Sequence, residues 1–113
     1  MSSPDTEPVF VVGLNVDADV EDRWNEWYEA VHVPEVLAAS PDILNATRYR
    51  LSAGSTSFRY LAIYRFASQE GLDRFMVSPQ LASMSHHYTE EWGRVSDRVR
   101  GAFTPISHHV PER

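Results

Sequence analysis

The sequence contains no cysteine and no lysine, and these two absences exclude several kinds of chemistry. Without cysteine the chain has no disulfide, no thiolate nucleophile and no cysteine-ligated metal. All ten basic residues are arginine, so no lysine can form a Schiff base with a substrate. No run approaches the roughly 18 apolar residues of a membrane span, and residues 1–8 lack the basic start and apolar core of a signal peptide. We therefore expect a cytoplasmic, soluble protein without a membrane partner.

Acidic residues outnumber basic ones, and the formal net charge is −6 over 113 residues. Nucleic-acid binding needs a basic face, so this balance argues against a nucleic-acid partner. The charge is uneven: residues 1–42 hold ten Asp or Glu and one Arg, whereas residues 43–113 hold six Asp or Glu and nine Arg. The length and the 42% apolar content predict one domain over residues 9–110, with tails at 1–8 and 111–113.

Hydrophobic periodicity predicts structural elements in the order β-α-β-β-α-β. We expect strands over residues 9–16, 43–51, 58–66 and 102–110, and a helix over residues 20–37. A second helical segment starts at Ser68 as N-cap and is broken at Ser78-Pro79. Its longer part carries an apolar stripe that reaches Val99, with Gly101 as the C-cap. In the third strand the alternation places Phe58 and Tyr64 on the same face.

This order is that of the split βαβ, ferredoxin-like α+β fold. It predicts a four-stranded antiparallel sheet with the helices on one face. The strands are apolar or aromatic on both faces, so the uncovered face must also be covered, and a second copy of the chain is the simplest cover. We predict a homodimer in which the two sheets form an α+β barrel.

Residues 20–37 carry the most distinctive pattern. Large apolar residues recur there at helical spacing: Val20, Trp24, Trp27, Tyr28 and Val31. Tyr28 and His32 stand four apart on one stripe, and Pro34 is expected to bend or end the helix just after the histidine. Asp17 and Asp19 are expected to supply its N-cap. An imidazole suits proton transfer near neutral pH, so His32 is a candidate acid/base; the alternative is an ordinary histidine at the edge of an aromatic core.

The pattern aromatic-x-x-aromatic-aromatic-x-x-x-His-x-Pro, formed by Trp24, Trp27, Tyr28, His32 and Pro34, resembles the helix of the EthD-like branch of the dimeric α+β barrel proteins. The resemblance covers roughly residues 9–109. It implies a ligand cavity between the sheet and the helices, with Tyr28 and His32 near its mouth. It also implies a cofactor-independent enzyme that acts on a hydrophobic aromatic or polyketide-like small molecule.

The candidate catalytic residues are His32, Tyr28 and His87. The candidate substrate-binding residues are Asn15, Trp24, Trp27, Tyr64, Phe75, Tyr88 and Trp92. Adjacent histidines on a helix diverge by about 100°, so at most one of His86 and His87 faces a cavity. Asn15 is the polar member of an otherwise apolar strand, and it either pairs with a neighbouring loop or binds a ligand. Gly13, two residues earlier on the same face, leaves room for a close approach to the backbone. The histidine spacing fits no metal site, and we expect none.

An arginine turned inward could hold a carboxylate or enolate. The candidates on the second and third strands are Arg48, Arg59 and Arg65.

Two branches of the superfamily differ at defined positions. Measured from Pro79, Phe75 and Leu81 stand where the plant polyketide cyclase has its catalytic tyrosine and histidine. In the haem-degrading branch, Asn15 and His86 or His87 match an asparagine and a histidine, but Phe75 stands near the place of a tryptophan.

We therefore expect proton-transfer chemistry of the cyclase, dehydratase or isomerase type. The alternatives are a cofactor-free monooxygenase of an anthrol-like substrate, a haem- or ligand-binding dimer without catalysis, and a dimeric subunit that stabilises a larger pathway enzyme.

Overall fold

The computed structural model describes residues 6–113; residues 1–5 of the expected N-terminal tail lie outside them. The strands and helices follow in the order β1 (Val9–Val16), α1 (Glu21–Trp27), α2 (Val33–Ala38), β2 (Ile43–Arg50), β3 (Tyr60–Phe66), α3 (Gln69–Met76), α4 (Pro79–Trp92) and β4 (Ser96–Phe103). None of the helices within residues 6–113 is long and apolar enough to cross a membrane.

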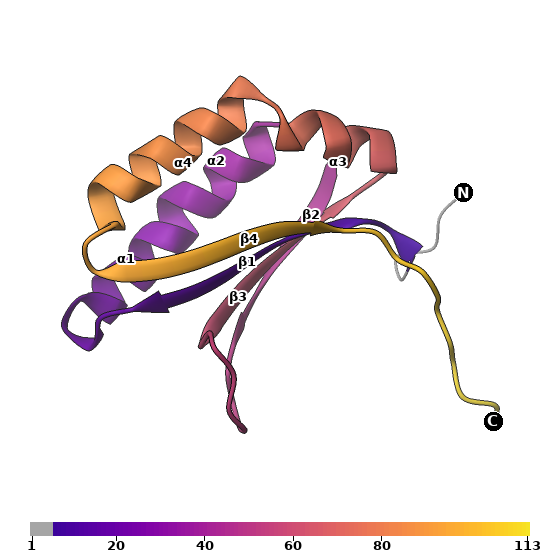
Figure 1. Cartoon of the computed structure of the whole chain (residues 1–113), viewed down its shortest axis with the longest axis horizontal. Coiled ribbons are helices and arrows are strands. Elements are labelled where there is room, and N and C mark those ends of the chain that lie inside the picture. Colours follow the sequence, from indigo (N-terminus) through magenta and orange to yellow (C-terminus); the bar gives the residue numbers. More distant parts are fainter. Residues whose placement is uncertain (1–5) are drawn as a thin grey trace.

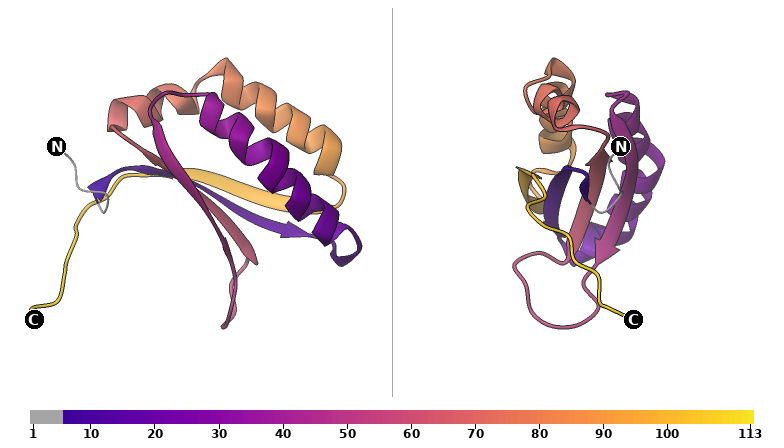
Figure 2. Two further views of the ribbon diagram at one scale, coloured as in Figure 1. Left: turned by 180° about the vertical axis from the view of Figure 1, so that it is seen from behind. Right: turned by 90° about the vertical axis from the view of Figure 1, so that its right-hand side faces the viewer.

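The four strands form one antiparallel sheet in the order β2-β3-β1-β4. All helices lie on one side of this sheet, and the other side is open (Figures 1 and 2). This is the predicted ferredoxin-like α+β fold, and the prediction is confirmed. The edge strands are β2 and β4, and α4 runs along the β4 side of the sheet (Figure 1).

The strand side chains that face the helices form the core. On β3 these are Tyr60, Ala62, Tyr64 and Phe66, which are all buried as the alternation predicts. The break between α3 and α4 is also as predicted. The Ser68 and Ser78 hydroxyls accept hydrogen bonds from the N–H groups of Gly71 and Leu81 and so cap the two helices.

The last strand differs from the prediction in its position. β4 spans Ser96–Phe103, so Val99 and Gly101 lie in the strand rather than in a helix and its C-cap, and the strand predicted over residues 102–110 is wrong. The helical stripe continued past Trp92 only by coincidence of spacing, because the backbone turns at Gly93 and pairs with β1 from Ser96 onward. Residues 104–113 form no strand and extend away from the sheet (Figure 1).

The first helix neither ends nor breaks at Pro34. It widens into a π-helical turn over Tyr28–His32, in which the Val33 N–H bonds to the Tyr28 carbonyl, and then continues as α2. Proline lacks an N–H and crowds the carbonyl four residues earlier, so the backbone just before it is the natural place for a wide turn. Asp17 occupies the N-cap position of a 3-10 turn over Ala18–Val20 that leads into α1, but its side chain makes no capping hydrogen bond, and no side chain caps α1.

The open face of the sheet carries an ordered loop. The loop between β2 and β3 brings the Phe58 ring over Gly13, where a β-carbon would lie 3.0 Å from the ring. Phe58 thus covers the open face of the sheet, whereas the predicted alternation placed it on the same face as Tyr64. The prediction failed because β3 begins only at Tyr60, so Phe58 lies in the loop. The same face exposes Leu61, Val99 and Phe103, of which Val99 is 56% exposed.

Candidate functional site

His32 is the one buried histidine among residues 6–113, with 7% of its surface exposed. It lies in the π-helical turn and is enclosed by aromatic rings. The imidazole stacks on Trp27, with ring centres 5.1 Å apart and planes 18° apart. Tyr28 meets it edge-on at 4.8 Å, and the Tyr88 ring of α4 lies 5.9 Å away. The wide turn therefore brings Tyr28 and His32 to the same buried face.

The His32 ring has an unsatisfied nitrogen. Its Nδ1 is buried and has no hydrogen-bond partner within the described residues. The Glu35 carboxylate oxygen is 3.7 Å from Nδ1, which is too long for a hydrogen bond. Burial lowers the pKa of His32 to about 4, and the positive charges of Arg98 and Arg48 contribute to the shift. His32 is therefore neutral at neutral pH and keeps an unpaired nitrogen.

Tyr64, on β3, presents a second unsatisfied group to the same region. Its hydroxyl is buried and has no hydrogen-bond partner within the described residues, and burial raises the pKa of Tyr64 to about 12. Burial likewise raises the pKa of Tyr28 well above its usual range, and the adjacent Tyr64 phenol adds to that shift. Both phenols are therefore protonated at neutral pH.

A small cavity lies between the sheet and the helices beside these groups. Its volume is about 20 Å³, enough for one water. Apolar side chains of β1, α2 and α4 form most of its wall. The polar part of the wall consists of His32, Tyr64, Ser85, Arg98 and Arg100. The site thus combines a neutral base, an unpaired phenol and two cations in a largely apolar setting.

The two arginines come from edge strand β4. Arg98 pairs with Leu14 and Arg100 with Val12 of β1, so both point to the helix side of the sheet. Arg98 Nη2 donates to the Ser85 carbonyl at 2.9 Å and to its hydroxyl at 2.8 Å. The Arg98 guanidinium lies 4.2 Å from the centre of the Tyr88 ring. These contacts join β4 to α4 directly beside the cavity.

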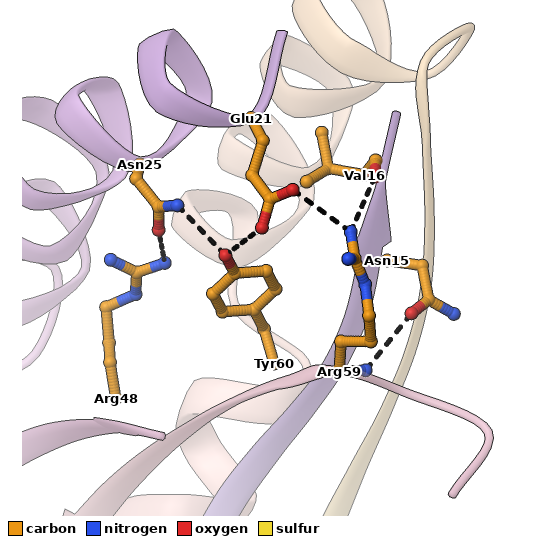
Figure 3. Close-up of polar contacts among 7 residues, drawn as sticks. All are labelled: Asn15, Val16, Glu21, Asn25, Arg48, Arg59 and Tyr60. Carbon is orange, nitrogen blue, oxygen red and sulfur yellow. Dashed lines mark hydrogen bonds and ion pairs between the residues drawn. The ribbon is translucent and has the colours of Figure 1, made fainter. Parts of the chain in front are cut away.

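A chain of polar contacts holds α1 against β2 and β3 (Figure 3). Arg48 donates to Asn25 at 2.8 Å, Asn25 donates to the Tyr60 hydroxyl at 3.1 Å, and Tyr60 donates to Glu21. Arg59 lies 3.3 Å from the same Glu21 carboxylate. This network fixes the helix that leads into the His32 turn.

Arg48 also reaches the aromatic cluster. Its guanidinium lies 4.5 Å from the centre of the Tyr28 ring, and it forms an ion pair of 2.7 Å with Glu29. Its charge is therefore already balanced by a carboxylate.

Several predicted site residues surround His32 without lining the cavity. The Trp24 indole donates to the Tyr88 hydroxyl at 3.0 Å, and Trp27 packs against Trp92 with ring centres 5.7 Å apart. Tyr28 lies between Trp24 and the histidine. Together they form the rigid aromatic wall that supports the imidazole.

Three other predicted residues lie away from this site. Asn15 projects on the open face, where it donates to the Ser57 carbonyl at 2.8 Å and accepts from the Arg59 N–H at 3.0 Å (Figure 3). It therefore holds the β2–β3 loop. Phe75 packs into the core beneath α3 against Phe10. His87 is exposed on α4.

Arg98 and Arg100 were not among the predicted site residues, because the hydrophobic periodicity placed this stretch in a helix. The signal was their spacing of two residues, which puts both on one face once the stretch is a strand. Of the three arginines considered, Arg48 and Arg59 are paired with carboxylates and Arg65 pairs with Val9 across the sheet on its open side.

The sequence of residues 8–98 matches the family described as "Domain of unknown function (DUF4286)". The chain belongs to this family. The match thus runs from β1 to the third residue of β4, and it includes His32, Tyr64 and Arg98. A comparison with curated proteins gave no match.

Solved structures confirm the EthD-like, dimeric α+β barrel resemblance at the level of the fold. The haem-degrader MhuD from Mycobacterium tuberculosis is 16% identical, with a TM-score of 0.64, and covers 91% of this chain and 99% of its own. An EthD family protein from Bacillus halodurans is 15% identical, with a TM-score of 0.60 and coverage of 83% and 96%.

A third similar structure is SnoaB from Streptomyces nogalater, described as a cofactor-independent oxygenase. It is 20% identical, with a TM-score of 0.59 and coverage of 95% of this chain and 99% of its own. At sequence identities this low, the similarity shows that the DUF4286 chain shares the fold of these proteins and nothing more.

Proposed function

We propose that the protein is a cofactor-independent enzyme that binds a hydrophobic aromatic small molecule between the sheet and the helices, with His32 as the proton acceptor. The observation that supports this most is the pair of buried polar groups without a hydrogen-bond partner, His32 Nδ1 and the Tyr64 hydroxyl, on two residues that line one largely apolar cavity. Buried polar groups are normally hydrogen-bonded, so two of them together suggest that a ligand supplies the partners.

The chemistry follows from the neutral state of His32. A C–H bond next to the substrate's carbonyl breaks, the proton moves to a ring nitrogen of His32, and the electron pair moves to the carbonyl oxygen. The low pKa of the free imidazole makes it a weak base, so the substrate must be an activated carbon acid. Once the anion forms, it stabilises the imidazolium, and it also offsets the arginine charges that disfavour the imidazolium in the free protein. Cyclisation, dehydration and isomerisation all begin with such a step.

The second candidate function is cofactor-free oxygenation of an anthrol-like substrate. It begins with the same proton transfer, after which dioxygen takes electrons from the carbanion. The fold shared with SnoaB supports it.

Haem fits the residues poorly. The His32 ring is packed between Trp27, Tyr28 and Tyr88. His86 and His87 are exposed on α4. Axial ligation of haem iron would require His32 to leave its aromatic enclosure.

The test uses 1,8-dihydroxyanthrone, an activated carbon acid, under argon in D₂O. Proton NMR follows the exchange of its methylene hydrogens. We expect the protein to accelerate exchange and His32→Gln to remove about 10²- to 10⁴-fold of that acceleration, the usual contribution of one acid/base group. His87→Gln is the matched control and should keep the full rate. Equal exchange by the wild type and His32→Gln would show that His32 is not the base. Admitting air and measuring oxygen uptake then separates oxygenation from the other reactions.

A further inference from the structure

Arg98 and Arg100 form an unbalanced pair of charges. The described residues provide a carboxylate within ion-pair distance for Arg48, Arg59 and Arg74, but for neither Arg98 nor Arg100. Arg23, Arg50 and Arg94 also have no carboxylate within ion-pair distance among the described residues, but Arg98 and Arg100 differ from them because both line the cavity beside His32. Burial lowers the pKa of Arg98, and the charge of Arg100 lowers it further, so the two cations repel each other. An anion between them would remove that repulsion.

Arg98 and Arg100 lie at the boundary between the small cavity and the protein surface. Arg98 is held against α4 by its two hydrogen bonds to Ser85. Arg100 lines both the small cavity beside His32 and an outer groove of about 480 Å³ between α4 and β4. Leu81 and Ser85 also line both spaces. These side chains therefore form the partition between solvent and the buried histidine.

The groove is also the route by which a ligand could reach the cavity beside His32, because the two spaces share wall residues. β4 is an edge strand, so movement of its side chains disturbs no further strand. A ligand that draws the Arg98 guanidinium away from Ser85 would open this partition. The cavity of about 20 Å³ must enlarge to hold a ligand of any size, and it would do so here.

We propose that Arg98 and Arg100 bind the carboxylate of the substrate, an aromatic monocarboxylate that reaches His32 through the groove between α4 and β4. This inference rests on the proposed function and names the substrate class of the same site. The guanidinium fork matches a carboxylate in two-point geometry. The apolar wall of the cavity accommodates the aromatic ring of the substrate. When Arg98 turns to the carboxylate, the Ser85 hydroxyl loses its hydrogen bond from Arg98 and can bond to solvent or to the ligand.

The experiment compares two probes of one shape, 2-naphthoate and neutral 2-naphthamide, by titration calorimetry with the wild type. We expect 2-naphthoate to bind and 2-naphthamide to bind at least tenfold more weakly. Arg100→Met and Arg98→Met should each weaken 2-naphthoate binding by about 10- to 100-fold, the usual effect of removing one charge-assisted hydrogen-bond donor, and should leave 2-naphthamide unchanged.

Arg94→Met is the matched control, since it removes the same charge from an exposed position between α4 and β4. It should leave binding of both probes unchanged. Arg98 packs on Tyr88, so Arg98→Met can disturb folding, whereas Arg100 is exposed and its variant remains informative.

The carboxylate subsite is overturned if the wild type binds the two probes equally, if it binds neither, or if Arg100→Met binds 2-naphthoate as the wild type does. The proposed function is judged separately by the dependence of anthrone exchange on His32. That exchange can persist with a neutral substrate when the carboxylate subsite is wrong, so the two failures are distinguishable.

Discussion

The burial of His32 predicts a specific dependence of stability on pH. The folded pKa of about 4 lies below the ordinary value of 6.5, so the unfolded chain takes up a proton first as the pH falls. His32 thus favours folding above pH 6.5 relative to lower pH, and this contribution is lost progressively down to about pH 4. At about 1.4 kcal/mol per pH unit, the full difference is about 3 kcal/mol. Between pH 7 and pH 5 the expected loss is about 2 kcal/mol.

The assay is urea unfolding followed by tryptophan fluorescence at fixed protein concentration, for the wild type and His32→Gln at pH 7 and pH 5. Carboxylates titrate in both proteins, so their effect cancels in the difference of unfolding free energies. We expect the wild type to lose about 2 kcal/mol more than His32→Gln. His87→Gln, changed at an exposed site, should follow the wild type. Equal losses in the wild type and His32→Gln would refute the view that His32 is buried and neutral.

Tyr88→Phe leaves the buried Trp24 indole N–H without its acceptor, and we expect urea unfolding to show a loss of about 1–3 kcal/mol; an unchanged midpoint would contradict the hydrogen bond. Gly13→Ala places a methyl 3.0 Å from the Phe58 ring and should lower the free energy of unfolding by about 1–3 kcal/mol. Adding Phe58→Leu should restore part of this loss, and purely additive effects of the two changes would argue against the contact. Val99→Asp puts a charge on the open sheet face. We predict that light scattering finds a dimer for the wild type and a monomer for this variant, and a variant that stays dimeric would place the interface elsewhere.

The parts of the fold that depend on local chemistry could be predicted from the sequence. β1 has the predicted bounds because its apolar run is short and rich in β-branched residues. The break between α3 and α4 follows from Ser78-Pro79, which caps one helix and cannot continue the other. Both features need no knowledge of distant residues.

The position of β4 could not be predicted in this way. Its helix-facing residues, Arg98 and Arg100, are charged, whereas Val99 and Phe103 on the open face are apolar. This reverses the usual pattern of a strand in a two-layer fold, so periodicity assigned the stretch to a helix. The reversal places the two arginines in the wall of the cavity beside His32.

The candidate site was predicted only in part. The spacing of Tyr28 and His32 correctly placed them on one face, but Pro34 was expected to bend or end the helix, whereas the helix widens into a π-helical turn before it and then continues. Whether His32 has a partner depends on distant strands and on α4, which a local pattern does not encode. Asn15 stood out as a lone polar residue in an apolar strand, and of its two predicted roles the structure shows the pairing with a neighbouring loop.

The most direct test of the central claim is NMR of the protein with ¹³C-labelled histidine during titration with 1,8-dihydroxyanthrone. The chain has five histidines, and the stacking of His32 on Trp27 gives its ring signal a distinctive ring-current shift. We predict that the His32 signal alone moves and that the change saturates. A titration in which His32 stays unchanged, or in which only the exposed histidines respond, would contradict a ligand site between the sheet and the helices.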